Sequence, residues 1–398
     1  MKSIITGATI IDGTGANPIE NGVLVMDEKR IAAVGKASAV ALPADGKVID
    51  ADGMYIIPGL IDAHIHLDLH GMADTYQENL VEDKIRTLRA AAEMENTLRA
   101  GFTTVRSLGS ANGIDFAVKA GIEAGYTKGP RIITAGKIIC MTCAGTDYFA
   151  GMYRIADGTD ECRKAAREQL RDGADCLKVM ATGAVMNPGG VPGAAQLNVE
   201  EMRAVVEEGA KLGRHTAAHA HGSQGVVNAV KAGCRTIEHG TMADEAAITA
   251  MAEAGAYLVP TMCLHDIFET HADAIPRFMI EKSRAMKEKH IAVVATALKT
   301  GVKLALGTDA GTNYNFHGWN FQEIVFYVNA GLMSPLDALV TATGNTAEAI
   351  SLDDRLGTLT TGKLADAVVL KADPLKDLSV LGKPEAIAMV FKDGRRQF

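Results

Sequence analysis

The chain has 398 residues and a formal net charge of -8, with 47% hydrophobic, 22% charged and 5% aromatic residues. This composition is that of an ordinary globular protein, and it excludes disordered, collagen-like and disulfide-scaffold classes. The acidic balance leaves no basic surface for phosphate groups, so we expect no nucleic-acid partner.

Short strands separated by turn residues are predicted over residues 1–57, in the runs SIITGATIIDG, NGVLVMD, RIAAVG and KVIDADGMYIIPG. From Gly59 the pattern changes to short runs rich in Val, Ile and Thr that alternate with helical stretches, which is typical of βα units around a parallel sheet. The eight predicted strands are 60–66, 102–108, 131–136, 176–181, 215–220, 235–240, 256–261 and 302–308. Eight parallel strands favour an α/β fold with a closed (β/α)8 TIM-type barrel over an open sheet.

Helices are predicted between these strands, near 78–100, 160–172, 198–212, 223–232, 243–254 and 277–300, with two more near 334–352. The tail then returns to strand-like sequence in GTLTTGKLADAVVLKADP and AIAMVFKDGRR. Strands from one terminus alone would leave an unpaired edge, so we predict that both ends pair into one small β-sandwich domain. The predicted division is residues 1–57 plus 355–398 for this domain and 58–354 for the barrel.

Cysteine usage and hydropathy indicate the compartment. The six cysteines are too sparse and too irregularly spaced for a disulfide framework, and we expect no signal peptide before them. No run of about 18 apolar residues occurs, so no membrane partner is expected. We therefore expect a cytoplasmic protein, and a homo-oligomer.

Histidine is the one unusual feature of the composition, because most of the 11 residues fall in a few tight groups. In a barrel of this kind, the active site lies at the carboxyl ends of the strands. The residues at or just after predicted strand ends are His64, His66, His219, His221, His239 and Asp309. His64 and His66 are two residues apart, so both side chains point the same way, as two ligands of one metal ion must. A lone His-x-His is a weak signal, but burying six polar groups in one barrel mouth without a function would be costly.

Lys178 lies within a predicted buried strand, in Cys176-Leu177-Lys178-Val179-Met180. Burial disfavours the charged ammonium form, so a free amine becomes accessible there. A free amine can capture carbon dioxide, and the resulting carbamate is an anionic ligand that could bridge two cations. A structural lysine paired with an acid is an equally good interpretation of these residues alone.

Taken together, these residues resemble the amidohydrolase superfamily over nearly the whole chain. The resemblance rests on Pro58-Gly59-Leu60-Ile61-Asp62-Ala63-His64-Ile65-His66, Gly101-Phe102-Thr103-Thr104-Val105-Arg106, Glu238-His239-Gly240 and Gly307-Thr308-Asp309-Ala310-Gly311. The stretches Gly173-Ala174-Asp175-Cys176-Leu177-Lys178 and Ala218-His219-Ala220-His221-Gly222 are similar to the imidazolonepropionase-related branch, which includes prolidase-like and Xaa-Arg dipeptidases.

The resemblance implies a binuclear zinc centre that cleaves an amide bond of a small substrate such as a dipeptide or an N-acyl amino acid. His64, His66 and Asp309 would hold one ion and His219 and His239 the other, with carboxylated Lys178 and a nucleophilic hydroxide as bridges. Asp309 would move the proton from the hydroxide to the leaving nitrogen. His221 would either hydrogen-bond the carbonyl oxygen or support a ligand from behind.

Substrate contacts are expected from four residues near the mouth: Arg106, Tyr148, Met186 and His317. Arg106 is equally suited to a structural ion pair inside the barrel. The loop Thr142-Cys143-Ala144-Gly145-Thr146-Asp147 departs from the Gly-Gly-His segment of dipeptidase relatives, which leaves cyclic amides, aryl amides and carbamate-type substrates open. Four other histidines show no partner pattern: His70, His265, His271 and His290. Of these, His290 lies in a charged helix and is expected to be solvated.

Two further functions stay open at this point. A non-catalytic scaffold barrel is disfavoured, since a scaffold has no need for a complete set of metal ligands. A mononuclear deaminase is disfavoured by Lys178, because such a site needs no bridging carbamate.

Overall fold

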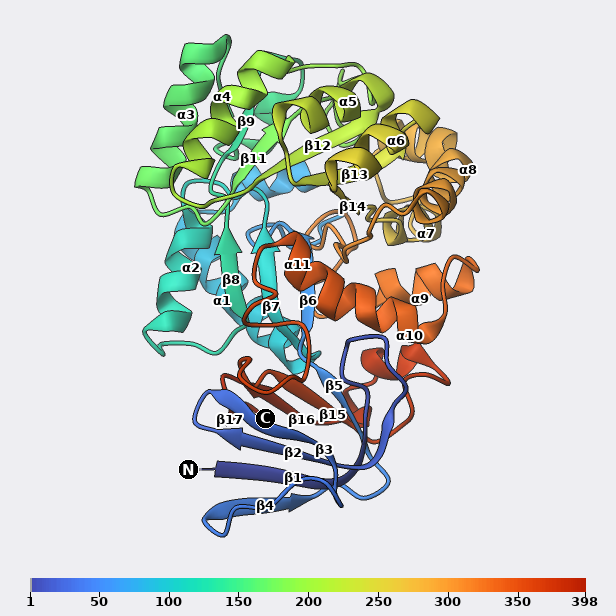
Figure 1. Ribbon diagram of the computed structural model, residues 1–398. Helices are drawn as coiled ribbons and strands as arrows, with labels where there is room; N and C mark the ends of the chain where they lie inside the picture. Colours follow the sequence, from blue (N-terminus) through green and yellow to red (C-terminus); the bar gives the residue numbers. More distant parts are fainter. Residues whose placement is uncertain (1) are drawn as a thin grey trace.

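Strands from both ends of the chain share one sheet in the computed structural model, which describes residues 2–398. The eight-stranded sheet has the order β17-β16-β15-β5-β1-β2-β3, with β4 paired to β1, and it carries both termini at the lower end of Figure 1. Its strands are β1 (Lys2–Ile10), β2 (Ile19–Asp27), β3 (Arg30–Lys36), β4 (Gly46–Asp50), β5 (Tyr55–Pro58), β15 (Ala367–Leu370), β16 (Ile387–Lys392) and β17 (Arg395–Arg396). The antiparallel pairing of β5 with β15 joins the two ends, as predicted.

Alternate residues of these paired strands serve two hydrophobic cores. Ile56 lies opposite Val369, and both pack in the core of the chain-end sheet. Their neighbours Ile57 and Val368 also lie opposite one another, but they belong to the cluster that extends through the rest of the molecule. Because successive side chains of a strand point to opposite faces, this period of two attaches the sheet to the body of the protein.

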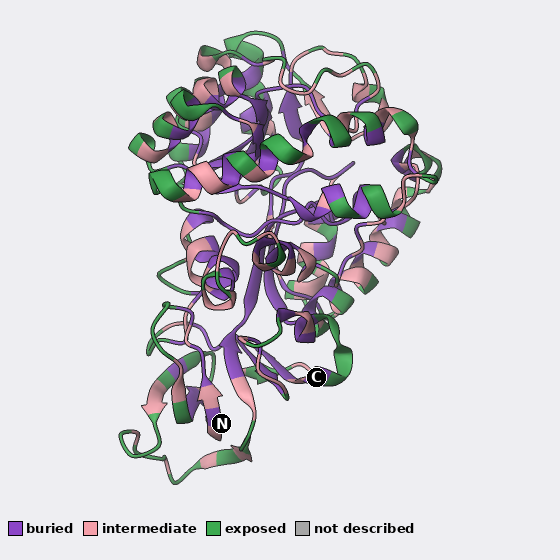
Figure 2. Ribbon diagram, turned by 90° about the vertical axis from the view of Figure 1, so that its right-hand side faces the viewer, coloured by how far each residue is buried: buried purple, intermediate pink, exposed green. Residues whose placement is uncertain are grey.

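Nine more strands run through the rest of the chain in two parallel sheets, β6-β7-β8 and β10-β9-β11-β12-β13-β14. They are β6 (Leu60–Ile65), β7 (Phe102–Ser107), β8 (Arg131–Thr134), β9 (Ile138–Cys140), β10 (Tyr153–Ile155), β11 (Leu177–Met180), β12 (Thr216–Gly222), β13 (Thr236–Met242) and β14 (Tyr257–Val259). Figure 2 shows these strands as buried ribbons inside helices that have exposed outer faces. Seven of the eight predicted strands are present, and β9 and β10 are additional.

The predicted eighth strand, residues 302–308, is not a strand. Isolated parallel bridges join this part of the chain to β14 and to β6, at Leu258–Leu304 and at Ile65–Ala310. Between the bridges, the Thr346 hydroxyl accepts a hydrogen bond from the backbone N–H of Leu306 (2.7 Å), so a side chain takes a donor that a strand ladder would use. The strand order therefore does not join the two sheets into one closed barrel, although backbone hydrogen bonds link this segment to β14 (Ala305 N–H to the Leu258 carbonyl, 2.9 Å) and to β6 (Ala63 N–H to the Leu306 carbonyl, 2.8 Å).

Helices cover the outside of the two parallel sheets (Figure 1). They are α1 (Asp83–Arg99), α2 (Ile114–Glu123), α3 (Thr159–Arg171), α4 (Val199–Ala210), α5 (Ser223–Ala232), α6 (Glu245–Ala254), α7 (Cys263–Thr270), α8 (Arg277–Thr300), α9 (Gln322–Asn329), α10 (Pro335–Val340) and α11 (Thr346–Ala349). Short helical turns are η1 (Thr75–Leu80), η2 (Thr146–Phe149), η3 (Thr341–Asn345), η4 (Leu378–Gly382) and η5 (Pro384–Ala386). The predicted helices 223–232 and 277–300 coincide with α5 and α8, whereas α2, α7 and α9 escaped prediction.

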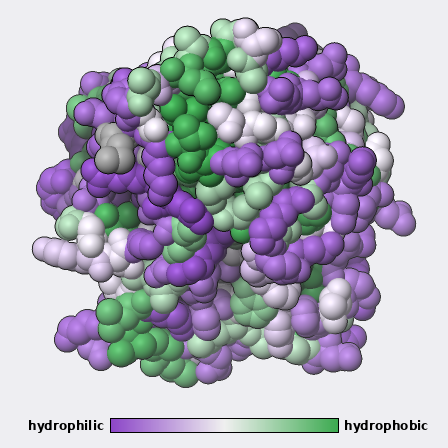
Figure 3. Space-filling model, turned by 90° about the horizontal axis from the view of Figure 1, so that it is seen from below, coloured by the Kyte–Doolittle hydropathy of each residue, from purple (hydrophilic) through white to green (hydrophobic). Residues whose placement is uncertain are grey.

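Hydrophilic side chains cover most of the face shown in Figure 3, which is the end that carries the chain-end sheet, and hydrophobic side chains gather there in limited patches. Among residues 2–398, no helix combines the length and the apolar character that a bilayer span requires.

Candidate metal centre

One cavity contains every side chain expected at the metal centre. It is lined by His64, His66, Lys178, His219, His221, His239 and Asp309. These residues lie on β6, β11, β12 and β13, directly after β6 in the case of His66, and after residue 308 in the case of Asp309, all at the same edge of the parallel sheets. The fold therefore brings together groups that are up to 245 positions apart in the sequence (309 minus 64).

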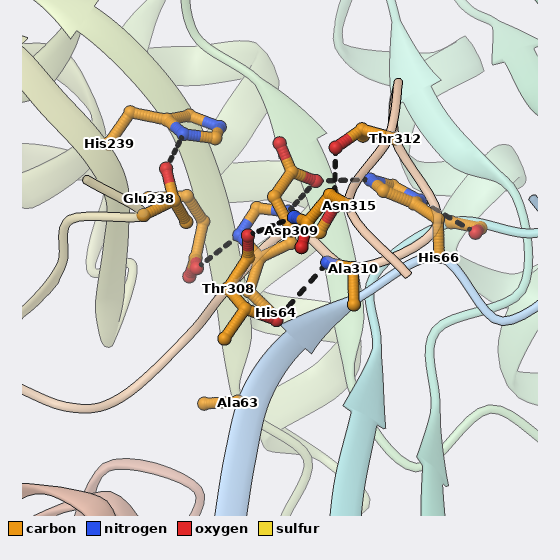
Figure 4. Close-up of polar contacts among 12 residues, drawn as sticks. Ala63, His64, His66, Glu238, His239, Thr308, Asp309, Ala310, Thr312 and Asn315 are labelled. Atoms are coloured by element: carbon orange, nitrogen blue, oxygen red, sulfur yellow. Dashed lines mark hydrogen bonds and ion pairs between the residues drawn. The ribbon is translucent and has the colours of Figure 1, made fainter. Parts of the chain in front are cut away.

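The protons of His64 and His66 can be assigned from their partners. His64 Nδ1 lies 2.9 Å from Glu238 Oε2, and His66 Nδ1 lies 2.9 Å from the carbonyl oxygen of Gly109. Both partners accept hydrogen bonds, so Nδ1 carries the proton in each neutral ring. The two Nε2 atoms are then acceptors, and they face Asp309 Oδ1 at 3.4 and 3.2 Å (Figure 4).

Three acceptor atoms that face one another require a positive centre between them. Asp309 Oδ1 and His219 Nε2 are buried and have no hydrogen-bond partner, which is rare for buried polar atoms. Ligand atoms of His64, His239 and Asp309 lie within 4.8 Å of one another. Unprotonated imidazole nitrogens with a carboxylate oxygen form a donor set that suits zinc and similar divalent ions. The residues present therefore fit a metal site.

The electrostatic environment keeps the imidazoles in the form that binds metal. Burial lowers the pKa of His64 to about 4. Burial also holds the pKa values of His219 and His239 well below the usual value, with further lowering by neighbouring imidazoles. Neutral rings at pH 7 need not lose a proton before they coordinate a cation.

A second group of imidazoles adjoins the first. The ring centroids of His219 and His239 are 4.6 Å apart, and that of His239 is 5.1 Å from that of His64. The His239 ring is held at Nδ1 by the Thr261 hydroxyl at 2.7 Å. His221 Nδ1 lies 2.8 Å from the Thr241 hydroxyl.

Three residues of the site have backbones in the left-handed region, which non-glycine residues seldom adopt. The φ angles are 71° for His239, 55° for Thr261 and 60° for Asp309. Such conformations cost about 1–3 kcal/mol each and persist where the surroundings enforce them, commonly at functional sites. Two of the three residues are expected metal ligands, and the third holds the ring of one of them.

Lys178 is almost fully buried, with 2% of its surface exposed. Burial lowers the pKa of its amine to about 8, although the carboxylates of Glu238 and Asp309 favour the charged form. The uncharged amine that carbamate formation requires is therefore far more accessible near neutral pH than in an ordinary lysine. Its place between β12 and β9, with Val179 opposite Ala218 and Ile139, directs it into the shared cavity.

A fully bonded polar layer supports the site from behind. The Arg106 guanidinium donates to the Ala63 carbonyl (2.7 Å) and pairs with Glu238 (3.1 Å), and Glu238 in turn holds His64. Although burial by itself would raise it, Arg106 and His64 hold the pKa of Glu238 at about 2. Asp62 accepts hydrogen bonds from the backbone N–H groups of His64 and Thr308, and so joins β6 to the Asp309 segment.

The structure places three of the four expected substrate contacts outside the lining of this cavity. Arg106 is fully buried in the ion pair with Glu238, the alternative that the sequence left open. The Tyr148 hydroxyl donates to Asp74, and His317 Nε2 lies 3.1 Å from the Leu69 carbonyl. None of the three lines the cavity, whereas Met186 does.

Several cavity residues escaped the sequence analysis. Thr241 and Thr261 follow strand ends without any distinguishing pattern, and His265 and His290 were assigned no partner. The expectation that His290 is solvated is wrong, since only 1% of its surface is exposed. Glu238 had a usable signal, because it precedes His239 on β13 and must point the opposite way.

The rest of the cavity wall is mostly apolar. Its apolar members are Leu69, Ile138, Phe149, Met152, Met180, Ala184, Val185, Met186, Leu264, Phe268 and Met286. Its remaining polar members are Tyr153, Asn187, Thr241, Thr261, His265, Ser283, His290 and Thr312. Among the described lining residues, Lys178 is the only lysine, and arginine does not occur.

The sequence profile of the amidohydrolase family matches residues 55–396. A crystal structure of a Xaa-Pro dipeptidase with methionine in its active site is similar at a TM-score of 0.91 and 32% identity, covering 100% of this chain and 99% of that one. Ochratoxinase of Aspergillus niger is 31% identical, over 99% of this chain and 86% of its own. Imidazolonepropionase of Symbiobacterium thermophilum is 25% identical, over 95% and 90%. The family and the dipeptidase structure imply a TIM-barrel-type fold with a β-sandwich domain.

Proposed function

The chain belongs to the amidohydrolase family and is a hydrolase of carbon–nitrogen bonds in amides; we propose that it works with two divalent metal ions, zinc by preference. The observation that carries the proposal is the set of converging acceptors in one cavity: two unprotonated Nε2 atoms and an unpartnered carboxylate oxygen. His64, His66 and Asp309 would hold one ion, and His219 and His239 the other. Carboxylated Lys178 would lie between them.

Bound divalent ions would supply an activated water at neutral pH and polarise the carbonyl group of the substrate. Asp309 would take the proton of the attacking water and deliver it to the leaving nitrogen, as general base and then general acid. His221 would donate a hydrogen bond from Nε2 to the carbonyl oxygen as negative charge develops there. This role requires Nδ1 of His221 to accept from the Thr241 hydroxyl, which lies 2.8 Å away.

The apolar character of the cavity wall helps to define the class of substrate that it suits. A dipeptide or an N-acyl amino acid carries a free carboxylate, and an apolar wall without arginine gives that charge little compensation. The same wall suits a bulky apolar group beside the scissile bond. We therefore place a neutral cyclic, aryl or carbamate-type amide beside the dipeptide and N-acyl amino acid candidates.

Matched substrates separate these candidates. N-Acyl phenylalanine and its neutral anilide or methylamide share the apolar group and differ in the charge, so we would compare kcat/KM within each pair. A higher value for the neutral member supports the neutral-amide class, and a higher value for the acid supports the carboxylate class. Cleavage of neither class by metal-loaded protein would contradict the proposed substrate range.

Metal analysis with the variant Lys178→Ala tests the centre itself. We expect about two ions per chain in the wild type, and loss of both metal and activity in Lys178→Ala, partly restored by small carboxylic acids such as acetate. One ion per chain, insensitive to the Lys178 change, would favour a mononuclear site. A wild type that binds no metal and folds equally well in chelator would overturn the metal-dependent function.

A further inference from the structure

Two histidines without a role in the expected chemistry form a hydrogen-bonded row with Ser283 beside the metal centre. His265 is on α7, and Ser283 and His290 are two helical turns apart on one face of α8. All three line the cavity. The row reads from Ser283 Oγ to His265 Nδ1 (2.9 Å), from His265 Nε2 to His290 Nδ1 (3.0 Å), and from His290 Nε2 to the His239 carbonyl oxygen (2.9 Å).

The direction of every hydrogen bond in the row follows from the carbonyl oxygen at its end. A carbonyl oxygen only accepts, so His290 Nε2 carries a proton and donates to His239. No acidic group bonds to either ring, and a charged imidazolium buried there would have no compensation. His290 Nδ1 is then an acceptor for His265 Nε2–H, and His265 Nδ1 accepts from the Ser283 hydroxyl. The row is therefore a neutral chain with a single direction.

The carbonyl at the end of the row belongs to a residue in an unusual conformation. His239 and Gly240 both have positive φ angles, 71° and 65°. The ladder between β13 and β14 ends at the Glu238–Val259 pair, one residue before His239. His290 therefore donates to the carbonyl oxygen of a residue whose backbone is in the left-handed region, while Thr261 holds the ring of the same residue at Nδ1.

We propose that His290 is a positioning residue that fixes the backbone of His239, and with it one position of the metal centre, and that His265 and Ser283 fix the orientation of His290. The inference rests on the proposed metal-dependent function. It differs from a purely packing role, because His290 would affect metal binding through one directed hydrogen bond. Partners that orient a ligand typically change metal affinity about 10–100-fold when they are removed.

A graded series of variants tests this chain. His290→Leu removes the N–H group that donates to the His239 carbonyl. His265→Leu keeps that donor and removes the hydrogen bond that orients the His290 ring. Ser283→Ala removes only the hydroxyl that orients the His265 ring. We expect the chelator concentration that releases the second metal ion to fall about 10–100-fold in His290→Leu, with smaller changes along the series. His290→Gln keeps an N–H donor on a side chain of similar reach, so it should restore most of the affinity.

Thr296→Val is the control on the same helix, since the Thr296 hydroxyl also donates to a backbone carbonyl, that of Ala292, within α8 and outside the cavity lining. It should leave the release of both metal ions unchanged. The absorption spectrum of cobalt-loaded protein gives a second readout, which should change in His290→Leu and return in His290→Gln. A loss of stability alone would not produce that pattern.

The experiments distinguish failure of the proposed function from failure of the positioning role. If the wild type binds no metal, the proposed function itself is wrong. If the wild type binds two ions and a folded His290→Leu releases them at the same chelator concentration, or if His290→Gln is no better than His290→Leu, the positioning role is wrong. Should His290→Leu fail to fold, the cobalt spectrum and metal release of His265→Leu decide, and unchanged values there overturn the inference.

Discussion

Glu238 and His239 are adjacent on β13, yet they belong to two buried regions that differ in whether their polar atoms have hydrogen-bond partners. In the Arg106–Glu238 layer, each Glu238 oxygen has a donor: Arg106 and Thr236 on one oxygen, and His64 on the other. In the cavity, Asp309 Oδ1 and His219 Nε2 are also buried and have none. A satisfied buried layer contributes to stability, whereas an unsatisfied one is ready for a ligand.

The change Asp309→Asn should show the largest effect, and it should appear in catalysis rather than in stability. Loss of the proton-transfer group should lower kcat by about 10²–10⁴-fold. The free energy of unfolding in chelator should stay the same or rise, because a buried unpartnered carboxylate is removed. Measurements are kcat at matched metal content and urea unfolding. A kcat within a few-fold of the wild type would contradict the assigned role.

The change Glu238→Gln should have the opposite signature. It leaves the Arg106 guanidinium buried without a counter-charge, which costs about 3–5 kcal/mol of unfolding free energy. The control is the double variant Arg106→Leu/Glu238→Leu, which removes both charges. Its loss of unfolding free energy should be smaller than that of the single variant. Equal losses in the two proteins would show that the ion pair is not what stabilises this layer.

Acid should weaken the same layer as the Glu238 carboxylate becomes protonated. The pKa of Glu238 is about 2 in the folded protein against an ordinary 4.5, so its contribution is present above pH 4.5 and lost as the pH falls toward 2. The loss should be about 3 kcal/mol. The free energy of unfolding, measured with a chemical denaturant, should fall more steeply between pH 5 and pH 3 in the wild type than in Glu238→Gln. Parallel curves would argue against this titration.

On the cavity side, Thr261→Val should act through metal affinity. It removes the hydroxyl that holds His239 Nδ1 and keeps the shape of the side chain, so the affinity for the second ion should fall about 10–100-fold. Competition with a chelator measures this. An unchanged affinity would mean that the ring of His239 needs no support from Thr261.

Thr241→Val is the matched change at the neighbouring ring and should have the smallest effect. His221 is not an expected metal ligand, so metal affinity should stay the same. Without the Thr241 hydroxyl, the proton of His221 is no longer kept on Nε2, and kcat should fall about tenfold, less than the cost of losing an oxyanion donor outright. A loss of metal instead would place His221 among the ligands.

The sequence by itself determined what depends on local patterns. The spacing of His64 and His66, and the short apolar runs that end in His219, His239 and Asp309, placed these groups at one edge of a parallel sheet. Membership of the amidohydrolase family is confirmed. Periods of two and of 3.6 residues are readable because they reflect contacts between near neighbours in the chain.

The tertiary structure alone decided which distant groups meet. Residues 302–308 read as a strand, but the Thr346 hydroxyl takes the Leu306 N–H that a ladder would use. From the sequence, Arg106 was equally suited to a substrate contact or to an ion pair, and only the folded position of Glu238 shows the ion pair. His290 read as solvated because its helix is charged, yet it is buried against His239. Hydrogen-bond partners and burial depend on residues tens to hundreds of positions away, which local periodicity does not encode.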